Sequence, residues 1–285
     1  MDREQAPIHS SFFISRPLCL TALNSLVPSA LLGESLTVSP PVLELKDVSL
    51  FLPGKPQDLV LLGDISTRIP AGQFVAIVGP SGCGKSTLLK AIAGLNEISL
   101  GHVIWKGRDL ETEGDLEPYE IGYVPKFSIA YDLLTVEENL DATLRLRLGG
   151  LSRAEREARK TEILTLVGLN AIADRQVKVL SGGQKRRLAL ALELATAPDL
   201  LLCDEVTSGL DPKAENELVT LLKTLTQQNC RTVLSVTHSL AHLDLYDSVI
   251  VLHGGHLAYH GPPQFLTHYF QIGEPADLYP QLSLR

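Results

Sequence analysis

The sequence lacks any hydrophobic run long enough to cross a membrane, which takes roughly 18 apolar residues or more. The most apolar segment, residues 12–32, is interrupted by Arg16, Pro17, Asn24 and Pro28. The start of the chain also lacks the basic region of a secretory signal, because its acidic residues outnumber its single arginine. We therefore predict no membrane span, no secretory leader and a cytoplasmic chain.

Cysteine and positive charge are also scarce. The four cysteines show no metal-ligand spacing, which excludes zinc modules. Lysine and arginine number 25 against 33 aspartates and glutamates, so the formal net charge is −8. Because clustered basic residues supply the affinity for a phosphate backbone, we expect no nucleic-acid partner.

The composition that remains is that of a folded enzyme. Of the 285 residues, 45% are hydrophobic and 20% are charged, enough for a large core with an additional subdomain. Residues 1–40 carry few charges and several serines and prolines, so we expect a mobile N-terminal extension, with a partner-binding segment as the alternative. Residues 41–272 are predicted to form the folded domain, and residues 273–285 a C-terminal tail.

A phosphate-binding loop lies between the apolar run Phe74–Val78 and a helix-forming stretch, residues 88–95. Its glycines permit a turn that points backbone N–H groups at phosphate oxygens. We predict that Lys85 reaches the β- and γ-phosphates and that Ser86 binds Mg²⁺, so the chain should bind a nucleoside triphosphate. The residues predicted to bind it, which complete the pattern G-x-x-x-x-G-K-[ST], are Gly79, Pro80, Ser81, Gly82, Cys83, Gly84, Lys85, Ser86 and Thr87.

One cysteine lies inside this loop. Cys83 is close in sequence to Lys85 and to the start of the following helix. Both features lower a thiol pKa, so we expect either a reactive thiol that bound nucleotide protects or an inert one.

A second signal is an apolar strand, residues 200–203, that ends in two adjacent carboxylates, Asp204 and Glu205. The carboxyl ends of such strands form the edge at which open α/β sheets bind ligands. We predict that Asp204 binds Mg²⁺, directly or through water. Glu205 is predicted to orient and deprotonate a water molecule for attack on the γ-phosphate.

The periodicity predicts the fold. Residues 42–51 alternate as a half-buried strand does, and an antiparallel β edge is expected up to residue 72. Capping-box patterns at Thr135 and Ser152 predict a helical insertion over about 127–180. Helices and strands then alternate from 182 to 252, including a helix over 239–245. The predicted class is α/β, a phosphate-loop NTPase core with an antiparallel β subdomain and an inserted helical subdomain.

A third motif, Leu180-Ser-Gly-Gly-Gln184, begins a helix about twenty residues before the carboxylate pair. Ser181 is predicted to cap this helix, and the amides of Gly182 and Gly183 to form a second anion site. The motif resembles the signature of ATP-binding cassette (ABC) ATPases. Residues 208–211 resemble the D-loop of that family, and residues 236–238 its switch histidine. The resemblance covers about residues 42–270.

The family resemblance implies an ATPase with ATP and Mg²⁺ as its ligands. In ABC ATPases, two domains stack head to tail, so a homodimer or heterodimer is expected. ATP would then meet the signature of the partner domain, and His238 would contact the γ-phosphate beside Lys85 and Glu205. An aromatic adenine platform is expected near Phe51, the residue there that can stack. The residues implied in contact across the dimer are Ser181, Gly182, Gly183, Gln184 and Asp211, the last with helix capping as its alternative role.

Two positions depart from the family pattern. Lys126 replaces the Q-loop glutamine, and Val206 replaces the proline that usually follows the catalytic glutamate. A lysine has donors but no acceptor, so Lys126 could pair with phosphate, pair with Glu205 or point to solvent. We hypothesise slow or differently regulated hydrolysis, with a neutral substitution as the alternative. We expect little effect from Val206.

Three further stretches, residues 190–196, 206–211 and 261–270, are similar to the G subfamily of eye-pigment and lipid exporters. This similarity implies an ATP-hydrolysing subunit that drives a permease of ABC-2/G type, on a separate chain or on a part removed from this one. Residues 127–139 would contact the permease at the cytosolic face of the membrane. The alternatives are a regulatory cassette that hydrolyses little ATP and a soluble ABC ATPase without a transport role.

Overall fold

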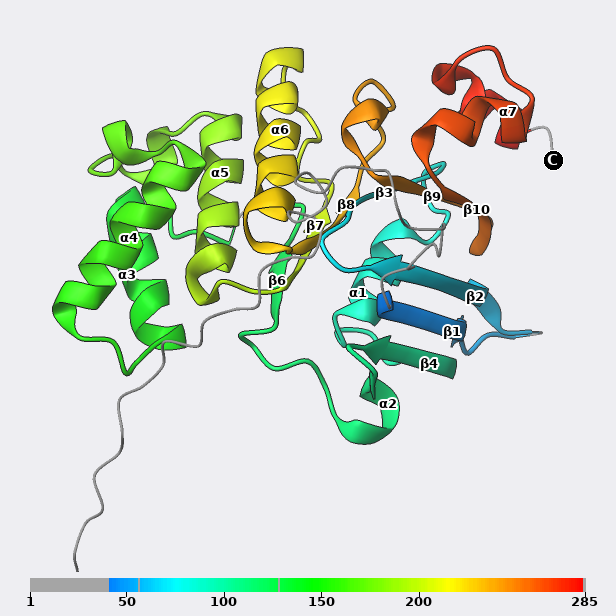
Figure 1. The fold of residues 1–285 in the computed structure, drawn as a ribbon, viewed down its shortest axis with the longest axis horizontal. Coiled ribbons are helices and arrows are strands. Elements are labelled where there is room, and N and C mark those ends of the chain that lie inside the picture. The colour runs from blue at the N-terminus through cyan, green and yellow to red at the C-terminus, as the bar shows by residue number, and fades with distance from the viewer. Residues whose placement is uncertain (1–40, 56, 128, 284–285) are drawn as a thin grey trace, which may run out of the picture. The chain divides into compact units, whose positions relative to one another are not determined.

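The computed structural model describes residues 41–55, 57–127 and 129–283 (Figure 1). The expected mobile extension, residues 1–40, lies outside the described residues. Within the described part of the chain, no helix combines the length and the apolar character needed to cross a bilayer.

A six-stranded sheet carries the loops that the sequence analysis singled out. Its strands lie in the order β10-β9-β3-β8-β7-β6, and each neighbouring pair is parallel except β10 with β9. Residues of β3, β7 and β8 are buried along the whole strand, as expected for parallel strands covered on both faces. The strands are β3 (Phe74–Val78), β6 (Ile121–Val124), β7 (Leu200–Asp204), β8 (Thr232–Val236), β9 (Ser248–His253) and β10 (His256–Gly261).

Alternate side chains of β3 enter two different cores, because successive residues of a strand point to opposite faces. Phe74, Ala76 and Val78 pack in the core that includes α5 (Gly182–Glu193) and α6 (Pro212–Asn229). Val75 and Ile77 pack in the core that includes α1 (Lys85–Ile92). The sheet therefore lies between α1, which follows the phosphate loop, and α5, which follows the signature motif (Figure 1).

A second sheet shares the α1 core. Its strand order is β2-β1-β4-β5, with antiparallel pairing throughout, so the predicted antiparallel β subdomain is confirmed. Trp105 at the end of β4 is almost fully buried in that core. The elements are β1 (Pro41–Leu52), β2 (Leu59–Pro70), β4 (Leu100–Trp105), β5 (Arg108–Asp109) and the short helix α2 (Leu110–Glu113).

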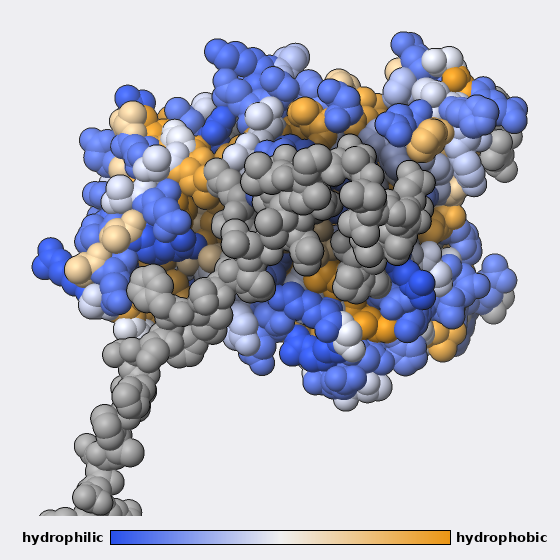
Figure 2. Space-filling view, viewed as in Figure 1, coloured by the Kyte–Doolittle hydropathy of each residue, from blue (hydrophilic) through white to orange (hydrophobic). Residues whose placement is uncertain are grey.

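The predicted helical subdomain contains α3 (Val136–Arg147) and α4 (Arg153–Val167). Complete capping boxes begin both helices at Thr135 and Ser152, as predicted. Buried leucines, isoleucine and valines on one side of each helix join the α5 core. Many of the other residues of α3 and α4 are exposed, and hydrophilic residues are frequent over this region on the face that Figure 2 shows.

The C-terminal part differs from the expectation in one place. The prediction of a helix over 239–245 is wrong, since only a single 3-10 turn, Leu243–Leu245, forms there. After β10, the chain forms α7 (Leu266–Phe270) and α8 (Leu278–Leu282). Leu278 and Leu282 of the predicted tail are buried in the α5 core, which anchors α8 to the domain.

Candidate functional site

The phosphate loop connects the end of β3 to the start of α1. Gly79, Gly82 and Gly84 have φ values of 151°, 79° and 99°, in the region that favours glycine. A Cβ on Gly84 would lie 2.8 Å from the Leu61 carbonyl oxygen, so the loop also requires glycine there for space. The loop thus has the tight backbone that a phosphate group requires.

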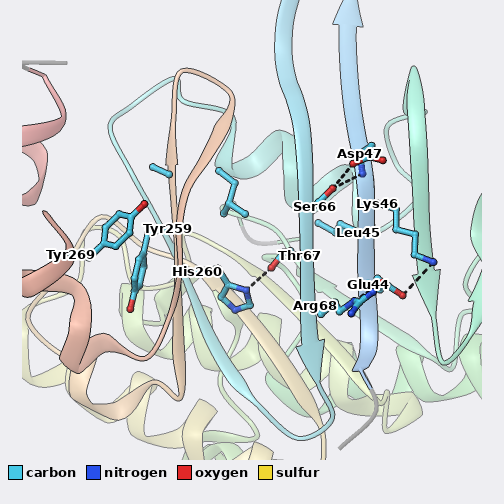
Figure 3. Close-up of a pocket in the computed structure, with 12 residues that line it drawn as sticks. Glu44, Leu45, Lys46, Asp47, Ser66, Thr67, Arg68, Tyr259, His260 and Tyr269 are labelled. Atoms are coloured by element: carbon cyan, nitrogen blue, oxygen red, sulfur yellow. Dashed lines mark hydrogen bonds and ion pairs between the residues drawn. The ribbon is translucent and has the colours of Figure 1, made fainter. Parts of the chain in front are cut away.

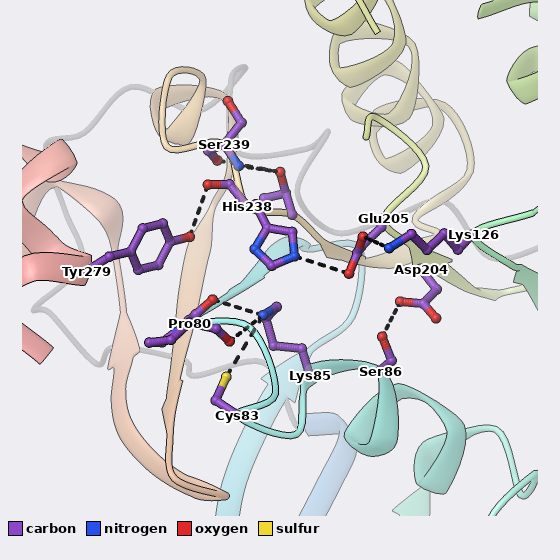
Figure 4. Close-up of polar contacts among 12 residues, drawn as sticks. Pro80, Cys83, Lys85, Ser86, Lys126, Asp204, Glu205, His238, Ser239 and Tyr279 are labelled. Atoms are coloured by element: carbon purple, nitrogen blue, oxygen red, sulfur yellow. Dashed lines mark hydrogen bonds and ion pairs between the residues drawn. The ribbon is translucent and has the colours of Figure 1, made fainter. Parts of the chain in front are cut away.

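Lys85 is buried and points back into its own loop (Figure 4). Its Nζ atom donates hydrogen bonds to the carbonyl oxygens of Gly79 and Pro80, both at 2.8 Å. Burial lowers the pKa of Lys85, and the nearby Cys83, Glu205 and Asp204 oppose this shift. The ammonium is the positive group inside the loop, where phosphate oxygens would replace the carbonyl partners.

The expectation of a lowered pKa for Cys83 is wrong. Its thiol is buried, and burial raises the pKa despite the attraction to Lys85, whose Nζ lies 3.9 Å from Sγ. The sulfur packs beneath Gly79, where an added Cβ would lie 2.7 Å from it. The structure therefore favours the inert thiol of the two alternatives.

Ser86 and Asp204 meet although they are far apart in the sequence. Ser86 Oγ donates a hydrogen bond of 2.6 Å to Asp204 Oδ1, and Tyr123 Oη donates one of 3.2 Å to Asp204 Oδ2. A hydroxyl and a carboxylate are the oxygen donors that Mg²⁺ prefers, and Mg²⁺ commonly takes only one or two protein ligands beside phosphate and water. The pair fits the Mg²⁺ position that the sequence predicts.

Tyr123, at the end of β6, is a site residue that the sequence analysis missed. Burial and the Asp204 carboxylate raise the pKa of Tyr123 well above its usual value, so the phenol stays a neutral donor. The sequence holds little sign of this role, since Tyr123 is simply one of the alternating residues of a short strand. The pairing of that strand with β7 brings Tyr123 near Asp204.

Glu205 is held by its backbone and by contacts with Lys126 and His238. Its φ is 50°, a value uncommon for a residue other than glycine, and its N–H donates to the Val236 carbonyl oxygen at 3.2 Å. Lys126 Nζ lies 2.7 Å from Oε2, and His238 Nε2 lies 3.1 Å from Oε1. Burial raises the pKa of Glu205, but the contacts with Lys126 and His238 outweigh burial, and the net pKa is lowered.

The phosphate loop, Glu205 and His238 share one cavity of about 170 Å³. The predicted residues Glu205, His238 and Lys85 are thereby brought together (Figure 4). Tyr279 of α8 supports this arrangement, because its hydroxyl donates to the His238 carbonyl oxygen at 3.1 Å. The cavity is lined by Ser81, Gly82, Gly84, Lys85, Ser86, Thr87, Glu205 and His238.

The signature residues lie elsewhere in the described domain and do not line this cavity. Ser181 Oγ accepts a hydrogen bond from the Gln184 N–H, and Gln184 Oε1 accepts one from the Ser181 N–H, so α5 begins with a capping box. Ser181 and Gly182 are exposed. Asp211 is also exposed and caps α6 through the N–H groups of residues 213 and 214, so its capping role is confirmed.

Phe51 is not among the residues that line the phosphate cavity. It lies half-buried on β1 opposite Val60, and its N–H donates to Ser99 Oγ. Leu52 beside it is 47% exposed. The assignment of Phe51 as the adenine platform stays a prediction.

A larger groove, of about 930 Å³, lies between β1, β2 and β10 (Figure 3). Ion pairs of Glu44 with Arg68 and Lys46 and a short hydrogen bond between Thr67 and His260 line it. None of the predicted site residues lines this groove.

Comparison with known proteins gives matches of sequence and structure. The family model described as ABC transporter matches residues 62–208. The chain is 39% identical over 208 residues to an ABC transporter ATP-binding/permease protein of Mycobacterium tuberculosis, covering 72% of the chain and 24% of that protein. It is 37% identical to the sulfate/thiosulfate import ATP-binding protein CysA of Mycobacterium bovis, covering 78% of the chain and 59% of the relative.

A third relative is the maltose/maltodextrin import ATP-binding protein MalK of Yersinia pestis, 37% identical over 74% of the chain and 57% of the relative. The chain thus spans less than two thirds of these relatives. Among solved structures, the dimeric ATP-binding cassette MJ0796 bound to ADP and Pi has a TM-score of 0.69 and 31% identity, covering 78% of this chain and 98% of its own. CbiO1 of Clostridium perfringens shares the fold, with a TM-score of 0.71 and 24% identity. The match covers 87% of this chain and 96% of CbiO1.

Proposed function

The chain belongs to the ABC transporter family, and we propose that it is the part of a membrane transporter that binds and hydrolyses ATP to drive a permease. It is an ATPase of the phosphate-loop α/β fold with ATP and Mg²⁺ as its ligands. The observation that carries the proposal is the single cavity in which Lys85, Ser86, Glu205 and His238 meet.

The residues of this cavity have different proposed roles in hydrolysis. Lys85 and the loop amides hold the phosphates, and Ser86 with Asp204 would hold Mg²⁺, which neutralises charge on the β- and γ-phosphates when bound. Glu205 accepts a proton from water as the water oxygen attacks the γ-phosphorus and ADP leaves. His238 Nε2 contacts Glu205, and His238 lines the same cavity, which supports its proposed contact with the γ-phosphate.

A head-to-tail dimer completes the proposed site. The exposed start of α5 at Ser181 and Gly182 presents backbone N–H groups and the positive end of the helix dipole, which suit a phosphate group that this domain does not itself hold. The dimeric state of the solved cassette MJ0796 supports this proposal. Either a second copy of this chain or a different cassette would serve as the partner.

The proposed permease surface follows Lys126 directly. Phe127, Ile129, Tyr131 and Leu133 are 76%, 54%, 73% and 74% exposed, an unusual density of large apolar side chains on a surface. Such a surface suits the cytosolic ends of a permease and would place the chain peripherally on the cytosolic face of a membrane.

The type of permease and the direction of transport are finer proposals. The motifs similar to the G subfamily favour an exporter with a permease of ABC-2/G type, and the ATP-binding/permease relative is compatible with it. CysA and MalK are import proteins by name, so the relatives do not support the export direction. A regulatory cassette with little hydrolysis is the second candidate, favoured by the Lys126–Glu205 contact.

The test is Mg²⁺-dependent ATP hydrolysis by the purified chain at increasing protein concentration, beside Glu205→Gln, with light scattering to follow dimers. We expect a rate that rises more than linearly with concentration, and a loss of roughly 100-fold or more in Glu205→Gln together with a dimer trapped by ATP. ATP binding without turnover in either protein would instead support the regulatory cassette. Full activity of Glu205→Gln would exclude Glu205 as the base.

A further inference from the structure

Lys126 contacts the proposed base directly. Its ammonium lies 2.7 Å from Glu205 Oε2, while His238 takes Oε1 at 3.1 Å, so each carboxylate oxygen already has a cationic or hydrogen-bonding partner (Figure 4). The Glu205 side chain is only 11% exposed. An attacking water must therefore compete with the ammonium for the oxygen that is to receive its proton.

The backbone around Lys126 is also fixed. Arg186 Nη1, on the first turns of α5, donates to the Lys126 carbonyl oxygen, and Lys185 Nζ of the same helix pairs with Asp132 at 3.3 Å. Lys126 itself is 44% exposed, so its side chain can leave Glu205 without unpacking the core. The segment that carries the ammonium is thus connected to the helix that begins at the signature motif.

We propose that Lys126 is a positioning residue that holds Glu205 in a resting ion pair, and that the γ-phosphate of ATP draws the ammonium away and frees the carboxylate. This inference rests on the proposed function, in which Glu205 is the base. The γ-phosphate provides the competing negative charge at the cavity that Glu205 lines, and ADP lacks it. Hydrolysis is consequently slowed by the fraction of time that the pair stays closed.

The first test compares kcat and KM for ATP in Lys126→Gln, Lys126→Met and Lys126→Arg. Both neutral variants should raise kcat roughly three- to fivefold with little change in KM, since a partly exposed ion pair is removed. Lys126→Arg retains a cation, so its kcat should stay below that of both neutral variants. Lys106→Met is the matched control, because Lys106 also forms a 2.7 Å ion pair at 45% exposure but away from the cavity.

The second test measures nucleotide binding without turnover, in EDTA, by fluorescence of trinitrophenyl-ATP and trinitrophenyl-ADP. Lys126→Met should weaken ATP binding more in the Glu205→Gln background than in the native background. In Glu205→Gln the ammonium no longer has to leave an ion pair before it contacts the γ-phosphate, so its removal costs more binding. ADP binding should be equal in all four proteins of this cycle.

The two proposals fail differently. Equal or lower kcat in Lys126→Met, with Glu205→Gln inactive, would overturn the resting ion pair and leave Glu205 as the base. An active Glu205→Gln would overturn the base itself. Thermal unfolding of each variant by circular dichroism identifies any loss of rate that comes from misfolding, and the binding cycle still decides in that case.

Discussion

At the scale of single residues, the Mg²⁺ position depends on how Asp204 is oriented. Ser86 and Tyr123 each donate to one of its two carboxylate oxygens, at 2.6 and 3.2 Å. Ser86 is itself a proposed Mg²⁺ ligand, whereas Tyr123 acts only through Asp204. Tyr123 therefore holds the carboxylate oxygen that Ser86 does not contact.

We predict that Tyr123→Phe raises the Mg²⁺ concentration needed for half-maximal hydrolysis about tenfold, as expected when a hydrogen bond that orients a metal ligand is lost. The measurement is the ATPase rate at fixed ATP over a Mg²⁺ titration. Tyr119→Phe is the matched control, since Tyr119 is 62% exposed on the chain just before β6. An unchanged Mg²⁺ requirement in Tyr123→Phe would show that Ser86 alone orients Asp204.

Residue identities were predictable where a motif specifies a local geometry, and less so where a contact joins distant segments. The glycines of the phosphate loop and the Asp204–Glu205 pair follow from short patterns tied to one strand end. In the sequence, Lys126 could pair with phosphate, pair with Glu205 or point to solvent, and the pairing of β6 with β7 brings it to Glu205. Tyr279 was unpredictable, because α8 reaches His238 from 41 residues away.

At the scale of elements, α5 connects the helical region to the sheet. Glu193 at its end is 5% exposed and accepts two hydrogen bonds of 2.9 Å from Arg147, the last residue of α3. Glu193 also accepts from the N–H of Tyr123 at 3.3 Å. One buried carboxylate therefore ties α3, α5 and β6 together.

We predict that Arg147→Met lowers the free energy of unfolding by about 3 kcal/mol, because it leaves the buried Glu193 carboxylate without its cation. Arg147 is partly exposed, so this cost is at the lower end of the range for breaking a buried ion pair. Urea denaturation followed by circular dichroism measures this. The control is Arg145→Met. The Arg145 side chain, which pairs with Asp141, is 62% exposed, so its loss should lower the free energy of unfolding by under ~0.5 kcal/mol. Equal losses in both variants would contradict the buried role of Glu193.

Helix starts were predictable because their signals are local. Thr135, Ser152 and Ser181 each cap a helix through bonds to residues three positions later, which the sequence displays directly. The helix expected over 239–245 did not form. There the chain must pass from the end of β8 into β9, and Leu243 and Tyr246 are buried in the core that constrains it. Such packing overrides a short periodic pattern.

At the scale of the whole molecule, the two halves of the proposed nucleotide site lie apart within one domain. The phosphate loop and Glu205 line one cavity, and Ser181 with its helix start is exposed apart from that cavity. A protein that uses both halves must bring in a second domain. The sequence predicts this arrangement only through the family resemblance, since no local pattern encodes an interface.

The final prediction tests this division by mixing two inactive proteins. Lys85→Ala disables a phosphate loop, and Ser181→Arg disables a signature by placing a bulky side chain at the exposed start of α5. In a head-to-tail dimer of the two, the two lesions meet in one site and leave the other site intact. With random pairing of equal amounts, half of the dimers are mixed and half of their sites are whole, so about a quarter of the native rate should return.

The measurement is ATP hydrolysis by the mixture against each variant alone at the same total protein concentration. Each single protein should remain inactive while unfolding at a temperature close to the native one. A mixture no faster than its components would mean that the two halves do not act across a dimer, or that one intact site cannot turn over alone. Mixing each variant with native protein separates these cases, because a requirement for two intact sites would make either variant suppress the native rate.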